Sequence, residues 1–248
     1  MASLLEVKNL RKQFSDTLVL KDITVTVEEG EFLVIMGQSG SGKSTLLYQI
    51  SGMDVPTSGE LLFENKKLTK LDDKALSQLR LEKMGFIFQK SHLLKNLSIR
   101  DNIILPGFKA NLLPRKEVVA HAEELMAKTG ILKVAEHDIT MVSGGQLQRA
   151  AICRALINHP KIIFGDEPTG ALNSAASNEV MTILKDINQV GTTLVLVTHD
   201  PKVAAQASRV IFLADGQITN QIRLDELPTD YSDQREKMMI DWLSQQSF

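Results

Sequence analysis

The sequence predicts an α/β fold built on a mostly parallel sheet. Four short apolar runs recur along the 248 residues, at 32–36, 162–164, 193–197 and 210–213. They are rich in β-branched residues and are apolar at successive rather than alternate positions, which is typical of parallel strands covered on both faces. Segments with helical spacing of apolar residues separate the runs, so we expect helices layered on the sheet.

Two further kinds of segment complete the predicted fold. Residues 4–27 and 59–88 show partial alternation of polar and apolar residues with turn residues between them, which indicates antiparallel β-structure. After Pro114 the apolar residues recur at helical spacing instead. We therefore expect an antiparallel β subdomain and an α-helical insertion beside the parallel core.

The chain is expected to form one domain in three parts. These are an α/β core with its antiparallel β subdomain (1–90 and 161–223), a helical subdomain (91–160) and a short helical tail (224–248). Apolar side chains in the tail are spaced as in an amphipathic helix, so we expect it to pack on its own domain, with contact to a partner or a membrane surface as the alternative. These side chains are Met238, Met239, Trp242 and Leu243.

Composition argues against several classes of protein. The chain carries 28 Lys and Arg against 30 Asp and Glu, so it lacks the basic surplus of a protein that binds nucleic acid through bulk charge. No apolar run approaches the roughly 18 residues of a membrane span, and no signal peptide is recognisable. We expect a cytoplasmic protein that reaches a membrane only through a partner. The one cysteine, Cys153, is expected to be a small buried hydrophobe rather than a reactive thiol.

The most specific motif is a glycine-rich loop between the strand-like run 32–36 and an apolar helical segment at 46–50. It fits the pattern G-x-x-x-x-G-K-[ST]. Glycines let successive backbone N–H groups and the positive end of a new helix approach a phosphate. We therefore predict nucleotide binding, with Lys43 on the β- and γ-phosphates and the Ser44 hydroxyl on Mg²⁺. The predicted binding residues are Gly37, Gln38, Ser39, Gly40, Ser41, Gly42, Lys43, Ser44 and Thr45.

A pair of carboxylates ends the buried run 162–164. Asp166 and Glu167 follow that strand, and Pro168 prevents its continuation. Ligands of open parallel sheets bind beyond the carboxyl ends of the strands, and adjacent strand residues point to opposite sides. We predict that Asp166 serves Mg²⁺ and that Glu167 is the general base for the attacking water. A lone acidic pair would more often be a solvated strand end.

A second helix start suited to phosphate lies at 142–149. Ser143 is a plausible N-cap, and the two glycines after it expose backbone donors. By itself this pattern is weak, because many helices begin in this way. The candidate binding residues are Ser143, Gly144, Gly145 and Gln146.

In combination and in order, these motifs resemble those of the ATPase subunit of ATP-binding cassette transporters, and the likeness covers nearly the whole chain. The loop 37–45 is similar to the family's Walker A motif. The segment 162–167 is similar to Walker B with its catalytic glutamate, and 142–146 to the signature motif. The resemblance implies a P-loop NTPase core that binds and hydrolyses ATP with Mg²⁺.

Three further residues have roles only through this resemblance. Gln89 stands at the place of the glutamine that senses Mg²⁺ and relays to the membrane partner. His199 stands at that of the histidine that contacts the γ-phosphate. Phe14 stands where the family has an aromatic side chain, usually tyrosine, that stacks on adenine. Taken alone, Gln89 and His199 would more often be surface or structural residues.

The resemblance also implies an assembly. Two copies would face each other head to tail, with the signature motif of one copy closing on the nucleotide of the other. ATP would hold this homodimer together and hydrolysis would release it. A separate integral membrane permease would bind the dimer at the cytoplasmic side of the membrane, and no nucleic acid is expected as a partner.

Segment 85–106 is similar to the ATPases of lipoprotein-release, macrolide-efflux and bacitracin-type peptide systems, and 197–201 together with 209–216 is most similar to the last group. We therefore expect export of, or resistance to, antimicrobial peptides or lipophilic substrates, and the short tail favours an exporter. The alternative is a cassette that drives a mechanical or signalling membrane partner. Asn173 stands where the family usually has aspartate, so turnover or communication between the two sites is expected to change.

Overall fold

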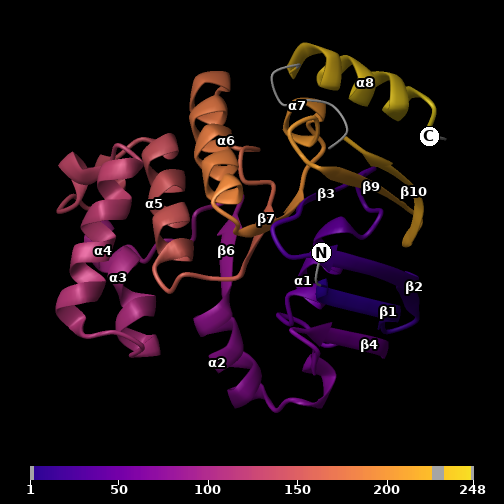
Figure 1. The fold of residues 1–248 in the computed structure, drawn as a ribbon, viewed down its shortest axis with the longest axis horizontal. Coiled ribbons are helices and arrows are strands. Elements are labelled where there is room, and N and C mark those ends of the chain that lie inside the picture. Colours follow the sequence, from indigo (N-terminus) through magenta and orange to yellow (C-terminus); the bar gives the residue numbers. More distant parts are fainter. Residues whose placement is uncertain (1–2, 225–231, 247–248) are drawn as a thin grey trace. The chain divides into compact units, whose positions relative to one another are not determined.

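Three of the apolar runs form neighbouring parallel strands, as predicted. The structure is a computed structural model that describes residues 3–224 and 232–246. β3 pairs in parallel with β8 on one side and β9 on the other, and β10 adds an antiparallel edge beside β9 (Figure 1). These strands are β3 (Phe32–Gly37), β8 (Thr193–Val197), β9 (Arg209–Ala214) and β10 (Gln217–Arg223). Every side chain of β8 is buried, as the uninterrupted apolar run requires.

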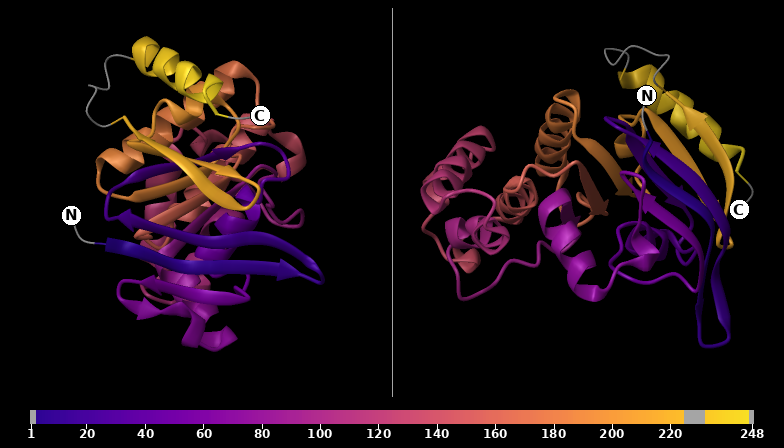
Figure 2. Two further views of the ribbon diagram at one scale, coloured as in Figure 1. Left: turned by 90° about the vertical axis from the view of Figure 1, so that its right-hand side faces the viewer. Right: turned by 60° about the horizontal axis from the view of Figure 1, so that its bottom comes forward.

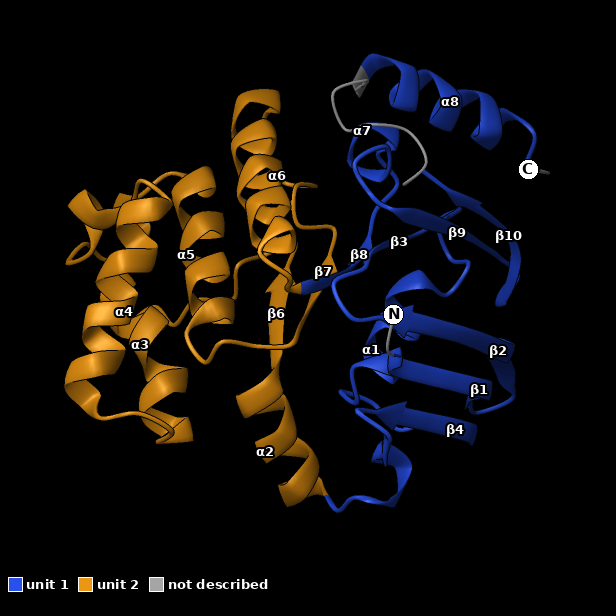
Figure 3. Ribbon diagram, viewed as in Figure 1, with its two compact units in different colours: residues 1–72, 193–248 blue, residues 73–192 orange. Residues whose placement is uncertain are grey.

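The chain divides into two compact units (Figure 3). One contains residues 1–72 and 193–248, and the other contains residues 73–192. The predicted parts 1–90 with 161–223, 91–160 and 224–248 stay a prediction. Within the predicted tail, residues 225–231 and 247–248 lie outside the described residues.

The first unit also contains the predicted antiparallel β-structure. Strands β1 and β2 form a long hairpin (Figure 2). β4 pairs with β1 on its other side, and β5 pairs with β4. Burial alternates along 23–27 of β2 but is interrupted in β1 by shifts in register, which explains why the sequence alternates only in part. The bounds are β1 (Ser3–Phe14), β2 (Thr17–Glu28), β4 (Ser58–Phe63) and β5 (Lys66–Lys67), and a short 3₁₀ turn (Leu68–Lys70) follows.

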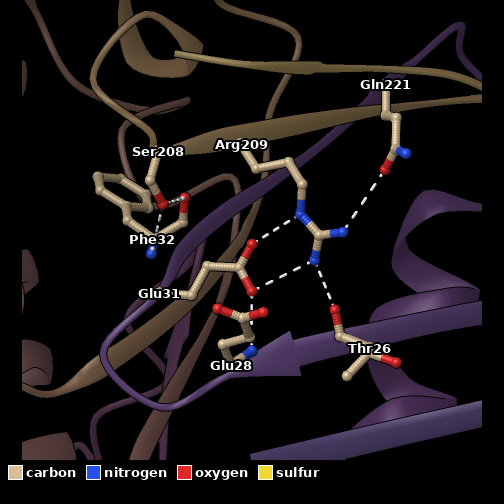
Figure 4. Close-up of polar contacts among 7 residues, drawn as sticks. All are labelled: Thr26, Glu28, Glu31, Phe32, Ser208, Arg209 and Gln221. Atoms are coloured by element: carbon tan, nitrogen blue, oxygen red, sulfur yellow. Dashed lines mark hydrogen bonds and ion pairs between the residues drawn. The ribbon is translucent and has the colours of Figure 1, made fainter. Parts of the chain in front are cut away.

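A buried ion pair joins the two sheets of the first unit (Figure 4). Arg209 of β9 donates from Nε to Glu31 Oε1 at 2.6 Å and from an Nη to Glu31 Oε2 at 3.2 Å. The same guanidinium donates to the carbonyl oxygen of Thr26 in β2 and reaches Gln221 of β10 at 3.5 Å. The side chains of Glu31 and Arg209 are 7% and 11% exposed. A buried ion pair therefore connects the hairpin to the parallel strands.

The last helix packs on its own unit. α8 (Ser232–Ser244) lies beside the short α7 (Pro201–Ala204), and Trp242 meets Phe212 of β9 edge to face, with ring centroids 6.2 Å apart. Arg235 is buried and donates to the carbonyl oxygen of Ala207. Across residues 3–224 and 232–246, no helix is both long and apolar enough to cross a membrane.

The second unit combines two parallel strands with helices. β6 (Met84–Phe88) pairs with β7 (Ile162–Asp166), and the helices are α2 (Asp73–Lys83), α3 (Ile99–Ala110), α4 (Arg115–Lys128), α5 (Gly144–Leu156) and α6 (Ser174–Gln189), with 3₁₀ turns at Leu132–Val134 and Ile139–Met141. Helices α3, α4 and α5 share a core that includes Ile103, Ala122, Met126 and Cys153. The helical spacing seen after Pro114 therefore reflects a true helical layer.

One interpretation of the sequence is wrong. Segment 59–88 was expected to be antiparallel β-structure, yet residues 73–83 form helix α2, and β6 pairs with β7 in parallel. Leu76 is the one buried side chain that α2 contributes, so the apolar periodicity of this helix is weak in the sequence. The direction of β6 depends on a strand about 80 residues away in the chain, which local pattern cannot reveal.

The Cys153 thiol is expected to resist modification in the folded protein. Its side chain is fully buried in α5, and its sulfur lies 3.2 Å from Thr129 Oγ1. Burial raises the pKa of Cys153 to about 12, so the reactive thiolate is scarce at pH 7 to 9. A colorimetric disulfide reagent should find no accessible thiol in native protein and one per chain in denaturant. Rapid labelling of native protein would contradict this.

Candidate active site

The predicted phosphate loop lies between β3 and α1 (Lys43–Ile50) in the first unit. A side chain at Gly37 is impossible, because a Cβ atom there would lie 2.1 Å from the carbonyl oxygen of Leu213. Gly42, with a φ of 99°, forms the N-cap of α1 without any side-chain hydrogen bond. The helix therefore begins with its positive end and its first N–H groups not capped by a side chain, as an anion site requires.

Polar side chains of the loop fit a phosphate as well. The Ser41 hydroxyl is buried and has no hydrogen-bond partner among the described residues. Lys43 Nζ folds back over the loop and donates to the carbonyl oxygens of Gly37 at 2.9 Å and Gln38 at 2.6 Å. A buried hydroxyl without a protein partner is costly, and a phosphate oxygen at this loop could accept a hydrogen bond from it.

The first unit brings His199 to the same sheet edge as the loop. β3 and β8 are parallel neighbours, with Ile35 opposite Val197, and Thr198 N donates to the carbonyl oxygen of Ile35 at 3.3 Å. His199 follows at the carboxyl end of β8, where its side chain is exposed. Phe14 ends β1, is 49% exposed and has the Lys12 ammonium over one face of its ring.

The second unit brings Gln89, Asp166 and Glu167 together. β6 and β7 pair so that Phe88 lies opposite Asp166, which places Gln89 beside the end of β7. A Cβ atom built on Gly170 would lie 3.0 Å from Gln89 Nε2 and 3.0 Å from Glu167 Oε2. The amide of Gln89 and the carboxylate of Glu167 thus converge over Gly170, and a larger residue there would push them apart.

The backbone at Glu167 is unusual. Its φ is 46°, in the left-handed region that a glutamate seldom adopts. The turn that follows closes with a hydrogen bond of 3.0 Å from Gly170 N to the carbonyl oxygen of Glu167. Strained backbone of this kind is concentrated at functional sites, where the surrounding structure maintains it. The Glu167 carboxylate lies close to Gly170 in this turn.

The signature segment begins α5 with a reciprocal cap. Ser143 is the N-cap, as predicted, and its Oγ accepts from Gln146 N at 3.3 Å while Gln146 Oε1 accepts from Ser143 N at 2.8 Å. Gly145 packs close to α6, since a Cβ atom there would lie 3.1 Å from Ala176 Cβ. The exposed Ser143 and Gly144 lie at the solvent end of this helix.

Comparison with known proteins decides the family. The family model described as "ABC transporter" matches residues 20–170. The lipoprotein-releasing system ATP-binding protein LolD of Leptospira interrogans is 41% identical over 87% of this chain and 91% of its own length. The chain belongs to the ATP-binding cassette family.

Other relatives agree with this assignment. The bacitracin export ATP-binding protein BceA of Halalkalibacterium halodurans is 42% identical over 89% of the cassette and 88% of its own length. The macrolide export ATP-binding/permease protein MacB of Campylobacter jejuni is 43% identical, but the match spans 34% of that longer protein. A dimeric post-hydrolysis structure of the cassette MJ0796 with ADP and phosphate has a TM-score of 0.83 and 38% identity over 89% of this chain and 98% of that one. This cassette therefore binds ATP and hydrolyses it as the nucleotide-binding subunit of a transporter.

Two residues of the cassette that sequence reasoning missed hold the segment around Gln89. Gln148 of α5 is buried and donates to the carbonyl oxygen of Phe88 at 3.0 Å. Arg154, also in α5, donates to the carbonyl oxygens of Ser91 and His92, each at 2.7 Å, and burial lowers its pKa. The helix that starts at the signature motif thus fixes the backbone on both sides of Gln89. The spacing of Ser143 and Gln146 in the sequence indicates the helix cap, but no pattern in the sequence indicates the contacts of Gln148 and Arg154.

Asn173 stands where the family usually has aspartate, so a variant with aspartate there measures what this negative charge contributes to ATP hydrolysis. Asn173 is the N-cap of α6, and its Oδ1 accepts from Ala176 N at 2.9 Å. Asn173→Asp preserves this cap, because aspartate is an equally good N-cap residue, so the melting temperature should stay within about 2 °C. We expect steady-state ATPase rate or its cooperativity in ATP to change. An Asp variant identical to the parent in both would show that the charge has no role.

Proposed function

We propose that the loop 37–45 holds the triphosphate of ATP and that Glu167 activates the water that attacks the γ-phosphate. Successive N–H groups of the loop and the N-terminus of α1 would donate to phosphate oxygens, and Lys43 would add a positive charge. His199 would contact the γ-phosphate, and Phe14 would stack on the base. The proposal is supported above all by the buried Ser41 hydroxyl, which has no hydrogen-bond partner within residues 3–224 and 232–246, beside a helix start that has no side-chain cap.

Mg²⁺ fits the donor set that the sequence predicts for it. Ser44, Gln89 and Asp166 supply hydroxyl, amide and carboxylate oxygens, which are the ligands that Mg²⁺ prefers. Gln89 follows β6 and Asp166 ends β7, and these two strands are paired. When bound, the ion neutralises charge that develops on the phosphates. In our proposal Ser44, Gln89 and Asp166 hold it, while Glu167 orients the water and accepts its proton.

The cassette is proposed to act as a head-to-tail homodimer. Ser143, Gly144, Gly145 and Gln146 would contact the nucleotide bound by the partner's phosphate loop, so ATP adds contacts only to the closed dimer. The exposure of Ser143 and Gly144 at the start of α5 supports this role, because they are accessible to a second copy. The dimeric structures of the similar cassette MJ0796 support it too.

Mixing two inactive variants tests the head-to-tail arrangement. Lys43→Ala removes the phosphate contact, and Ser143→Arg obstructs the signature motif. A mixed dimer would contain one intact site, formed by the loop of the Ser143→Arg chain and the signature of the Lys43→Ala chain. We expect the mixture to hydrolyse ATP faster than either variant alone at the same total concentration. A mixture no faster than its parents would contradict a site shared between chains.

We further propose that the dimer drives a separate membrane permease at the cytoplasmic side of the membrane and serves export of, or resistance to, antimicrobial peptides or lipophilic substrates. The similarity to LolD, MacB and BceA supports this class of system. A cassette that drives a mechanical or signalling membrane partner is the second candidate. The same motor would serve either.

Isolation of the tagged chain from native membranes tests the partner. We expect one polytopic membrane protein in stoichiometric amount, and an ATPase rate of the complex that responds to antimicrobial peptides or lipophilic compounds. A rate that responds instead to a cell-wall enzyme or a sensor kinase would favour the second candidate. A purely cytosolic chain bound to ribosomes would contradict both.

A further inference from the structure

The proposed base platform, Phe14, is held from one face by a lysine. Side chains two residues apart in a strand point to the same side, so Lys12 and Phe14 of β1 are neighbours. Lys12 Nζ lies 4.7 Å from the centroid of the Phe14 ring, within the range of cation–π attraction. The ring is nevertheless 49% exposed, so a large part of it remains available for stacking.

The lysine itself is anchored. Only 9% of Lys12 is exposed, and its Nζ donates to Asp54 Oδ1 at 2.9 Å and to the carbonyl oxygen of Val55 at 2.8 Å. Burial alone would raise the pKa of Asp54, but the hydrogen bonds from Lys12, Val55 N and Gln49 outweigh it and lower that pKa. Asp54 is therefore ionised at neutral pH and keeps the ammonium group beneath the ring.

Asp54 connects this lysine to the phosphate-loop helix. Gln49 in the last turn of α1 is completely buried, and its Nε2 donates to Asp54 Oδ2 at 2.7 Å. Its Oε1 has no hydrogen-bond partner among the described residues, and a buried oxygen without a partner lowers stability. An apolar side chain would fill the same space without that loss, so we attribute the glutamine to its hydrogen bond with Asp54. The contacts thus run from the ring through Lys12 and Asp54 to the helix that Lys43 begins.

We propose that Lys12 is a positioning residue for the nucleotide base: anchored on α1 through Asp54 and Gln49, it fixes the Phe14 ring so that the exposed part of the ring receives the base. The inference rests on the proposed stacking role of Phe14. It assigns to Lys12 an effect on binding of the base, with no effect on the phosphates or on the chemical step.

Steady-state kinetics with a base-free competitor test this role. Lys12→Met is expected to raise KM for ATP roughly three- to tenfold with kcat unchanged, because a lost ring contact weakens ground-state and transition-state binding equally. Inorganic tripolyphosphate, which has the phosphate chain but no base, should inhibit the variant and the parent equally. Lys12→Arg should restore KM, because it retains the charge. Lys8→Met, an exposed lysine of the same strand, is the matched control and should leave both constants unchanged.

The double variant separates failure of this inference from failure of the proposed function. Lys12→Met should add nothing to the KM of Phe14→Ala. If Phe14→Ala leaves KM unchanged, the stacking assignment is wrong and the inference falls with it. If Phe14→Ala raises KM and Lys12→Met does not, the inference alone is wrong. Weaker inhibition of Lys12→Met by tripolyphosphate would show that the lysine affects phosphate binding through α1, which would contradict the inference. Asp54→Asn, which keeps the side-chain shape, should raise KM in the same direction if Lys12→Met fails to fold.

Discussion

Glu167→Gln is expected to lower the ATPase rate by roughly 10²–10⁴-fold while ATP binding is retained. The amide keeps the size of the carboxylate but has no charge and cannot accept a proton from water. The Glu167 backbone is left-handed (φ 46°), and Glu167 Oε2 approaches Gly170, as does the Gln89 amide. The predicted loss corresponds to about 3–5 kcal/mol of transition-state stabilisation.

A single-turnover assay with radiolabelled ATP separates binding from chemistry in this variant. Glu64→Gln is a matched control, because Glu64 is also a glutamate with a left-handed backbone (φ 48°) but lies in the turn after β4. It should turn over at the parental rate. Normal single-turnover hydrolysis by Glu167→Gln would remove Glu167 from the role of general base and leave the Mg²⁺ ligands to be tested next.

The parts of the site that the sequence predicted are those that depend on local chemistry. The loop 37–45 begins α1 at Gly42, whose φ of 99° is a left-handed conformation that glycine adopts without strain. Ser143 caps α5 because its hydroxyl reaches the N–H group three residues ahead. Each of these features is decided within a few residues, so a short pattern contains the necessary information.

Features that depend on pairing across the chain were not predictable. The convergence of Gln89 and Glu167 over Gly170 depends on the register that sets Phe88 opposite Asp166. Strand β10 is a different case, because it pairs locally with β9 across the turn at Asp215 and Gly216, and it was missed because its exposed, polar residues lack the apolar run that marked β9. The contacts of Gln148 and Arg154 with the segment around Gln89 span about 60 residues of sequence. A single sequence holds no signal for such partners.

The second large effect is expected at the ion pair between Glu31 and Arg209. Arg209→Met removes the partner of a carboxylate whose side chain is 7% exposed, and it also deprives the carbonyl oxygen of Thr26 of a donor. An uncompensated buried charge is costly, so the free energy of unfolding should fall by about 3–5 kcal/mol. Trp242 is the one tryptophan of the chain and contacts Phe212 of β9, so its fluorescence in a urea titration reports on the unit that contains the pair.

The double variant Glu31→Leu/Arg209→Met should be less destabilised than Arg209→Met alone, because it removes the stranded charge together with its partner. Arg11→Met is the matched control. Arg11 donates to Asp22 at 2.6 Å, the same distance as from Arg209 to Glu31, but the side chains of Arg11 and Asp22 are about half exposed. The urea midpoint of Arg11→Met should therefore equal that of the parent. If Arg209→Met and Arg11→Met unfold at the same urea concentration, burial does not decide the strength of these pairs. If the double variant is instead less stable than Arg209→Met, Glu31 stabilises the protein without Arg209. The hydrogen bond from Glu28 N to Glu31 Oε2 at 2.8 Å would then be the contact that holds the two sheets together.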